Sequence, residues 1–135
     1  MRIDYESIKP IYLQIAEAIE DDILSGRLSE GSPAYSQLII SKELGVNPAT
    51  AAKGINALVD KEILIKQRGR PMTVADGAKA ALVASRQKNG LQSLIHDLVA
   101  EAQKINLSET EVITMLKDGF TNIGIDEQEG GDVDA

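Results

Sequence analysis

The sequence predicts a mostly α-helical protein with one small β-hairpin, and three observations support this fold class. Two closely spaced helix signals, each with its own capping residue, lie between residues 36 and 60. Two short β-branched runs on either side of a glycine turn follow them directly. The chain then returns to helical spacing and contains no proline after residue 71. Together they predict a winged helix-turn-helix domain followed by a short two-helix C-terminal dimerisation region.

The first helix is expected from Pro10 to Ser25. Proline suits the first position of a helix because it has no N–H that would be left unpaired there. Four isoleucines then recur at four-residue intervals and share one face: Ile11, Ile15, Ile19 and Ile23. Gly26 is expected to end the helix in a left-handed conformation.

Two short helices joined by a tight turn come next. Ser36 can cap a helix that runs to Leu44 and ends at Gly45. Asn47 is a strong cap before Pro48, which suits the first position of the following helix. Three apolar residues of that helix have the spacing of a buried face: Ala51, Ile55 and Leu58. A connection this short is typical of a helix-turn-helix.

The next segment predicts a β-hairpin. Ile63-Leu64-Ile65 and Met72-Thr73-Val74 are strand-like runs, and Gly69 supplies the turn between them. A hairpin that directly follows a helix-turn-helix is the wing of a winged helix.

Helical spacing resumes at Ala78 and gives a wide apolar stripe: Leu82, Leu91, Leu94, Ile95, Leu98, Val99, Ala102 and Ile105. Gly90 is expected to bend or break this segment. Ser108 and Glu111 form a capping box that begins a last helix. The apolar face of that helix consists of Val112, Ile113, Leu116 and Phe120.

Three regions are therefore expected. Residues 1–75 form the winged helix-turn-helix domain, residues 76–120 form a helical dimerisation region, and the acidic, glycine-rich residues 121–135 form a disordered tail. A lone pair of helices cannot cover both faces of the apolar stripe, so we predict a homodimer, with packing inside the chain as the alternative. The predicted interface consists of Leu91, Leu94, Ile95, Leu98, Val99, Ala102, Ile105, Val112 and Leu116.

The charge distribution favours nucleic acid as a partner, although the net charge of −7 by itself does not. Residues 1–75 carry a net charge of −1, and residues 76–135 carry −6. Residues 47–71 contain five basic and two acidic side chains, a net charge of +3. A local basic segment within a helix-turn-helix and wing is what a DNA-binding site needs.

Several functional classes are disfavoured by what the sequence lacks. It has no cysteine and one histidine, His96, which we interpret as a surface or interface residue, so we expect no metal and no cofactor. Neither a phosphate-binding loop nor a nucleophile elbow is present, which argues against an enzyme. No apolar run is long enough for a membrane span, and the first residues do not resemble a secretory signal, so a cytoplasmic protein is expected.

Five short segments of the first 75 residues carry a family resemblance. They are Pro10-Ile11-Tyr12, Gln14-Ile15, Ile23-Leu24-Ser25-Gly26-Arg27-Leu28, Leu44-Gly45-Val46-Asn47-Pro48-Ala49-Thr50 and Arg68-Gly69-Arg70. In combination they resemble the N-terminal winged-helix domain of GntR-family bacterial transcription factors. The tail of about 60 residues is similar in length to that of the YtrA-type subgroup. This resemblance implies dimerisation through the helical tail and control of a transporter operon.

The chain departs from the family pattern in its second helix. Where the family usually has Leu-Pro-Ser-x-Arg, this chain has Ala34-Tyr35-Ser36-Gln37-Leu38. Ile39 stands where the family is often acidic, and Ala52 stands where many members carry arginine. The second helix therefore brings less charge to DNA, and recognition is expected to rely on the wing. If the helical register were shifted by one residue, Leu38 and Ile39 would instead belong to the core.

The predicted site combines the start of the third helix with the wing. The helix is expected to enter the major groove by its N-terminal end. The predicted contacts from the two helices are Ser36, Asn47, Pro48, Ala49, Thr50, Ala52 and Lys53. Arg68 and Arg70 flank Gly69 at the tip of the wing, and arginine readily enters a narrow A·T-rich minor groove. The expected partner is a palindromic double-stranded operator, with half-sites about 34 Å apart.

Purely structural interpretations of these residues stay open. Asn47 and Pro48 also suit an ordinary helix start, and Arg68 and Arg70 also suit a solvated turn. A winged helix can serve as a protein-interaction module with little DNA binding, which the leucine at position 38 and the acidic tail would favour. The sequence leaves open a small-molecule effector and does not identify one.

Overall fold

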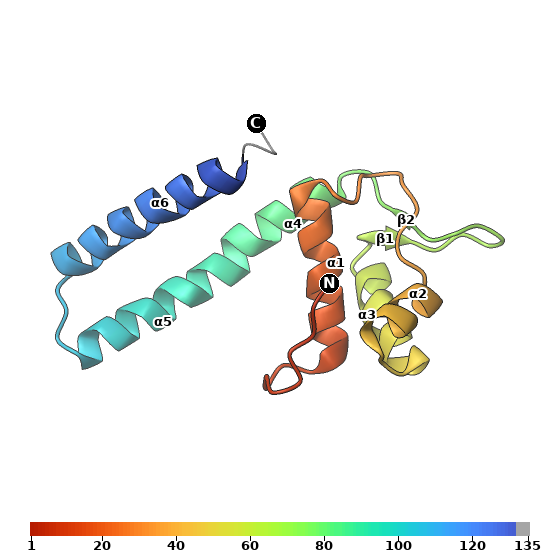
Figure 1. Ribbon diagram of the computed structural model, residues 1–135, viewed down its shortest axis with the longest axis horizontal. Coiled ribbons are helices and arrows are strands. Elements are labelled where there is room, and N and C mark those ends of the chain that lie inside the picture. Colours follow the sequence, from red (N-terminus) through yellow and green to blue (C-terminus); the bar gives the residue numbers. More distant parts are fainter. Residues whose placement is uncertain (132–135) are drawn as a thin grey trace. The chain divides into compact units, whose positions relative to one another are not determined.

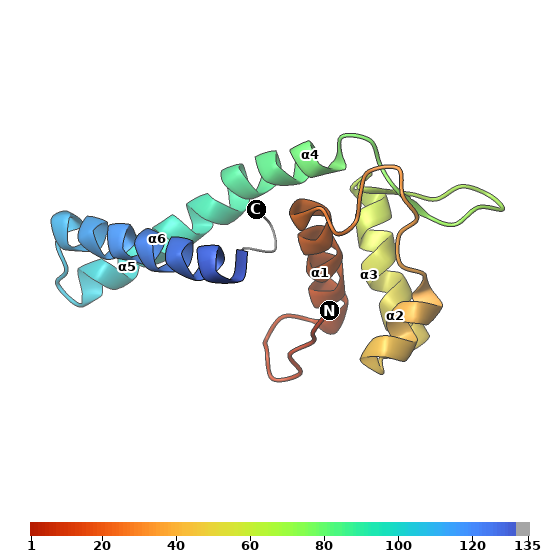
Figure 2. The same cartoon turned by 45° about the horizontal axis from the view of Figure 1, so that its top comes forward.

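The computed structural model describes the backbone of residues 1–131 and the side chains of residues 1–123. The described chain consists of two compact units, which are Met1–Lys88 and the part that begins at Asn89. Figures 1 and 2 show the order of the helices and strands along the chain.

The first unit is a winged helix-turn-helix, as predicted. It contains α1 (Ile11–Ser25), α2 (Gln37–Leu44), α3 (Pro48–Asp60), β1 (Leu64–Ile65), β2 (Thr73–Val74) and α4 (Ala78–Ser85). Helix α3 packs between α1 and α2, and α4 packs against α1. The two strands and the long loop between them form the wing, which projects away from the helices in Figure 1.

Local capping chemistry sets the starts of the three predicted helices. Pro10 precedes the first residue of α1, and Gly26 ends that helix with φ 86°. The Ser36 hydroxyl accepts a hydrogen bond from the backbone N–H of Ile39 at the start of α2. Asn47 caps α3 in the same way, with Pro48 as the first helical residue. These boundaries confirm the sequence prediction to within one residue.

The core of the first unit consists of the apolar faces predicted for α1 and α3 together with the strands. Its largest fully buried side chains are Ile15, Ile19, Ile23, Ile40, Leu58, Leu64 and Val74. Leu38 is 72% exposed and Ile39 is 49% exposed, whereas Ile40 is 2% exposed. The register of α2 is therefore the one that leaves Leu38 and Ile39 on the surface.

The wing strands form an antiparallel pair in which Leu64 faces Val74 and Ile65 faces Thr73. A third segment, which the sequence analysis did not identify, pairs with the second strand. The Val74 carbonyl accepts from the N–H of Gly31 at 2.8 Å, and the N–H of Val74 donates to the Ser32 carbonyl at 3.0 Å. The connector after α1 therefore joins the edge of the two-stranded sheet, where Pro33 forms an isolated β-bridge with Thr73.

Helix α4 belongs to the first unit, which corrects the predicted domain boundary at residue 75. Ala78 and Leu82 are buried in the core of the winged helix, so Leu82 does not continue the stripe of the later helix. The Glu30 carboxylate accepts hydrogen bonds from the N–H groups of Gly77 at 2.8 Å and Lys79 at 3.1 Å. These two backbone hydrogen bonds lower the pKa of Glu30, and they cap α4 from a distant loop.

Of the predicted bend or break at Gly90, the break is wrong, because the segment stays helical there. The π-helix η1 (Arg86–Gly90) follows α4 directly, and α5 (Leu91–Lys104) follows η1. Gly90 adopts an ordinary right-handed helical conformation.

The second unit contains α5 and α6 (Glu109–Gly131). The predicted capping box is confirmed, since the N–H of Ser108 donates to Glu111 at 3.1 Å and the N–H of Glu111 donates to the Ser108 hydroxyl at 3.2 Å. Helix α6 continues past residue 120, where we predicted a disordered tail. The apolar spacing from Leu116 through Phe120 to Ile123 supports this extension. Side chains from 124 and backbone from 132 lie outside the described residues.

Substitution of Gly54 by alanine is expected to destabilise the winged helix. A Cβ atom at this buried position would lie 2.8 Å from the Tyr12 carbonyl oxygen and 2.9 Å from Cγ2 of Ile15. The overpacking is expected to lower the free energy of unfolding by about 1–3 kcal/mol, despite the better helix propensity of alanine. Urea denaturation measures the change.

Gly119→Ala is the matched control, because a Cβ atom there meets nothing within 4 Å. We expect it to leave stability unchanged or to raise it by up to about 1 kcal/mol. Equal stability of the Gly54 and Gly119 variants would contradict the close approach of α1 and α3.

Candidate nucleic-acid interface

The start of α3 exposes most of the residues predicted to contact DNA. Asn47, Pro48 and Ala49 are exposed, and Thr50 and Ala52 are half-buried. The Asn47 side-chain oxygen accepts from the N–H of Ala49 at 2.8 Å. This bond uses the carbonyl oxygen of the amide and leaves its NH₂ group, a donor, available to a partner.

Lys53 is exposed and lies on the second turn of α3, but its side chain has a partner on α1. Its Nζ atom lies 4.2 Å from the centroid of the Tyr12 ring, which is the geometry of a cation–π contact. The contact holds the ammonium group near the surface of α1. Sequence reasoning identified Lys53 as a candidate phosphate contact and missed Tyr12, because no local pattern connects the two positions.

The start of α2 offers the polar side chains of Ser36 and Gln37 and two apolar side chains. The Ser36 hydroxyl accepts the capping bond from Ile39 at 3.1 Å, and its own hydrogen is still available to a partner. Leu38 and Ile39 are the exposed side chains of the following turn. In this region the surface of α2 is therefore more apolar than the start of α3.

Tyr35, which the sequence analysis left open as a packing or phosphate-contacting residue, anchors α2 to α1. Its hydroxyl donates to the Asp22 carboxylate at 2.5 Å, and its ring packs against the core. This hydrogen bond, reinforced by burial, raises the pKa of Tyr35 to about 12. The tyrosine thus holds the segment before α2 in place.

The wing exposes three cationic side chains, those of Lys66, Arg68 and Arg70. Gly69 has a φ of 74° and forms the turn, and the N–H of Arg70 donates to the Gln67 carbonyl at 3.2 Å. In the described part of the chain, no salt bridge involves Lys66, Arg68 or Arg70. By contrast, the Nζ atom of Lys61, another residue of the basic segment, lies 3.9 Å from Oε2 of Glu20. The charge of Lys61 is therefore directed toward α1.

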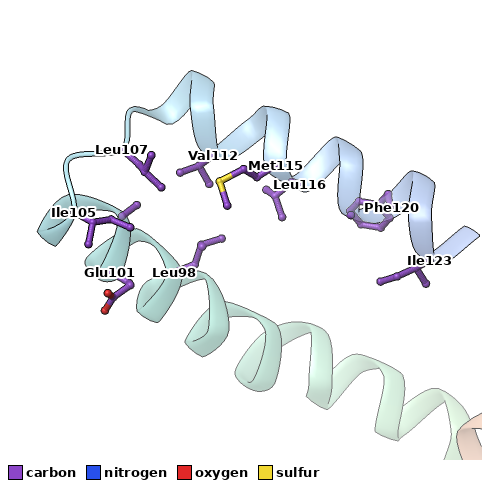
Figure 3. A pocket seen from close by; sticks show the side chains of 11 residues that line it. Leu98, Glu101, Ile105, Leu107, Val112, Met115, Leu116, Phe120 and Ile123 are labelled. Atoms are coloured by element: carbon purple, nitrogen blue, oxygen red, sulfur yellow. The ribbon is translucent and has the colours of Figure 1, made fainter.

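The predicted dimer-interface residues divide into two groups in the second unit. Leu98, Ala102, Ile105, Val112 and Leu116 line an apolar groove of about 450 Å³ between α5 and α6 (Figure 3). Leu91, Leu94, Ile95 and Val99 are exposed and do not line that groove. The two helices therefore leave large apolar side chains of α5 uncovered.

Neither a metal centre nor a membrane span is found in the part of the chain that the structure describes. No group of three or more metal-ligating side chains comes together there. None of the described helices combines the length and the hydrophobicity that a membrane crossing requires.

Comparisons with known proteins agree with this geometry. Residues 11–74 match the family "Bacterial regulatory proteins, gntR family". The chain is 28% identical to the HTH-type transcriptional repressor YtrA of Bacillus subtilis (strain 168) over 128 residues, covering 90% of this chain and 98% of YtrA. The resemblance to the YtrA-type subgroup is thereby confirmed.

Two solved structures of known proteins are also similar to this chain. YtrA from Sulfolobus acidocaldarius, a GntR-family transcription factor, is 28% identical, with a TM-score of 0.53 over 92% of this chain and 99% of that one. BusR of S. agalactiae, solved in complex with its busAB-promotor DNA, is 27% identical, with a TM-score of 0.50 over 84% of this chain and 56% of BusR.

Tyr35→Phe is expected to lower the free energy of unfolding by about 1 kcal/mol near neutral pH, because it removes the hydrogen bond to Asp22. The folded-state pKa of Tyr35 lies above its ordinary value of 10.0. The stabilisation is therefore fully present below pH 10 and is lost as the pH rises toward about 12. Denaturation of wild type and variant across this range measures the difference.

Tyr5→Phe is the control, because the exposed Tyr5 hydroxyl donates only a long bond of 3.3 Å to the Leu44 carbonyl. We expect this change to stay within about 0.5 kcal/mol of wild type. A deficit of the Tyr35 variant that did not shrink above pH 10 would contradict the assigned hydrogen bond.

Proposed function

The chain belongs to the GntR family of bacterial regulatory proteins through its winged-helix domain, and from this premise we propose that it is a homodimeric transcriptional repressor. It binds a palindromic operator in the cytoplasm and controls a transporter operon. The matched family and YtrA are both described as regulators, which supports a non-enzymatic role.

One observation carries the proposal: a single compact unit exposes both the start of α3 and a wing whose cations form no salt bridge with the described residues. The first turn of α3 presents the Asn47 amide and the Thr50 hydroxyl, next to the small apolar Ala49 and Ala52. Amide and hydroxyl groups can hydrogen-bond base edges in the major groove, and small apolar side chains fit thymine methyl groups. Helix α3 therefore enters the major groove by its N-terminal end.

The wing supplies a second, more strongly charged contact. Arg68 and Arg70 are exposed on either side of a glycine turn and have no acidic partner among the described residues. A narrow A·T-rich minor groove has an enhanced negative potential that attracts arginine. The wing therefore occupies the minor groove beside the major-groove site of α3. BusR, a structural relative, was solved in complex with its promoter DNA, which supports DNA as the partner.

Homodimerisation follows from the apolar surface of the second unit and from the small number of cations on one protomer. Leu94 and Ile95 are 66% and 50% exposed, although both are large and apolar. Contiguous exposed apolar surface of this kind marks interaction sites. Because about three to five phosphate contacts give only weak binding, two protomers on two half-sites bind far better than one.

Arg68→Ala combined with Arg70→Ala is expected to weaken operator binding, with the larger loss on A·T-rich flanks. Because the dimer has two wings, the substitutions remove four cations, which should also reduce the slope of log affinity against log salt by about 3.6. Fluorescence anisotropy with promoter duplexes from upstream of its own gene, with A·T-rich or G·C-rich flanks, measures both effects.

Lys79→Ala combined with Lys88→Ala is the charge-matched control, since both lysines are exposed and lie outside the basic segment. It should leave affinity and salt slope near the wild-type values. Equal losses on both kinds of flank would count against minor-groove contact, and wild-type chain that bound no duplex at low salt would refute the proposed function.

Leu94→Glu combined with Ile95→Glu is expected to convert the dimer into a monomer. Both residues lie outside the α5–α6 groove, so the substitutions leave the packing of the two helices intact. Light scattering should show the mass falling from twice 14.5 kDa to 14.5 kDa. Operator affinity should fall to that of a single half-site.

Leu38→Glu is the control for the dimer test, because it places a carboxylate at an equally exposed apolar position of the first unit. Its mass should equal that of the wild type. A wild-type chain that was already monomeric at micromolar concentration would contradict the proposed dimer.

A second function, a protein-interaction module, is favoured by one observation, the exposure of Leu38 and Ile39 at the start of α2. Two adjacent apolar side chains suit a protein partner better than a phosphate. Retention on DNA resin separates the two functions: a DNA-binding chain elutes at a salt concentration that rises with operator content, whereas an interaction module is not retained.

A further inference from the structure

Arg86 joins the end of α4 to α1 through two ion pairs. Its Nη2 atom donates to Oε1 of Glu20 at 3.1 Å, and its Nη1 atom lies 2.9 Å from Oδ1 of Asp21. The guanidinium group therefore engages two adjacent carboxylates of α1 with two different nitrogen atoms. A planar guanidinium group that is bound through two nitrogen atoms has a fixed orientation as well as fixed distances to its partners. We name this arrangement the Arg86 clasp.

Glu20 makes the clasp costly to open. It is 8% exposed and is the single buried charged residue of the described chain. Its other cationic partner, Lys61, lies 3.9 Å away, a longer contact than the one with Arg86. Removing the close cationic partner of a buried carboxylate strongly destabilises the folded protein, because it leaves an uncompensated buried charge. The clasp is therefore expected to stay closed while the first unit is folded.

Helix α1, which the clasp grips, also holds both helices of the predicted DNA site. Tyr12 of α1 lies beneath the ammonium group of Lys53 on α3, and Asp22 of α1 accepts from Tyr35 before α2. Arg86 attaches the outgoing helix to this same element. Any change in the direction of that helix at residue 86 would have to break the clasp.

The clasp also lies at the point where the helical hydrogen-bonding pattern changes. Arg86 is the first residue of the π-helix η1, and the remaining residues of η1 are exposed. π-Helical turns inside longer helices often mark functional positions, and mid-helix departures from α geometry mark hinges. Upstream of Arg86, Ala78 and Leu82 of α4 are buried in the core of the first unit.

We propose that Arg86 is a positioning residue that fixes the direction in which the helix leaves the winged-helix unit and confines bending to residues 87–90. In the homodimer of the proposed function, it would thereby restrict the separation of the two α3 helices and favour one half-site spacing. This last consequence rests on the proposed function, whereas the positioning role itself does not.

Distance measurement between two spin labels tests the positioning role directly. The chain contains no cysteine, so Lys42→Cys on α2 and Lys117→Cys on α6 give one label on each unit. Labelled chain is diluted into a large excess of unlabelled chain, so that only distances within one chain are recorded. In this background, Arg86→Gln is expected to broaden the distance distribution relative to the unsubstituted chain.

Amide hydrogen exchange provides a second readout. Loss of the charge-assisted bonds of Arg86 should speed exchange in residues 83–88 by about tenfold, while exchange in α3 stays unchanged. A residue that merely added stability would accelerate exchange throughout the unit and leave the width of the distance distribution unchanged. The two patterns therefore separate a positioning role from a general structural one.

Three further variants keep the test decisive. Glu20→Gln with Arg86→Gln removes the clasp without leaving a buried unpaired charge, and it should broaden the distribution even if Arg86→Gln alone folds poorly. Asp21→Asn removes only the ion pair between Arg86 and Asp21, and it should broaden the distance distribution less. Lys88→Gln removes a nearby charge that forms no salt bridge among the described residues, and it should match the wild type.

The proposal is overturned if folded Arg86→Gln and Glu20→Gln/Arg86→Gln chains give the wild-type distribution, or if the wild-type distribution is already as broad as theirs. Because the measurement uses neither DNA nor a labelled dimer, its outcome is independent of operator binding. Loss of operator binding in the wild-type chain would refute the proposed function and leave the positioning role standing.

Discussion

The close approach of α1 to α3 is the contact on which the arrangement of the first unit depends. Gly54 has no side chain, so the backbone of α3 reaches the Tyr12 carbonyl and the Ile15 side chain of α1. At this distance the isoleucine face of α1 and the buried face of α3 form one core. Interior packing tolerates little extra volume, and this explains why a single glycine sets the separation of the two helices.

With α1 fixed against α3, polar side chains of α1 reach three other segments. Tyr12 meets Lys53, Asp22 meets Tyr35, and Glu20 meets Arg86. Each of these contacts links α1 to a segment that either carries predicted DNA contacts or leaves the unit. Helix α1 contributes no predicted DNA contact of its own, yet it orients every element that does so apart from the wing.

The two units differ in how completely they bury their apolar side chains. The first unit buries its isoleucine and leucine faces inside one chain, because four helices and a small sheet surround them. The second unit has two helices, and a pair of helices can shield only the surfaces that face each other. Large apolar side chains of α5 therefore stay uncovered within the second unit.

The sequence by itself determined the features that depend on neighbours within about four residues: helix caps, the capping box at Ser108, the isoleucine face of α1 and the glycine turn of the wing. It also indicated the family, and it predicted the candidate DNA contacts. Only the tertiary structure decided that α4 joins the core, that Glu30 caps a helix 47 residues away, and that Arg86 meets a carboxylate 66 residues away. Periodicity identifies an apolar face but not the element it meets, and these long-range polar partners follow from the packing of α1 against its neighbours.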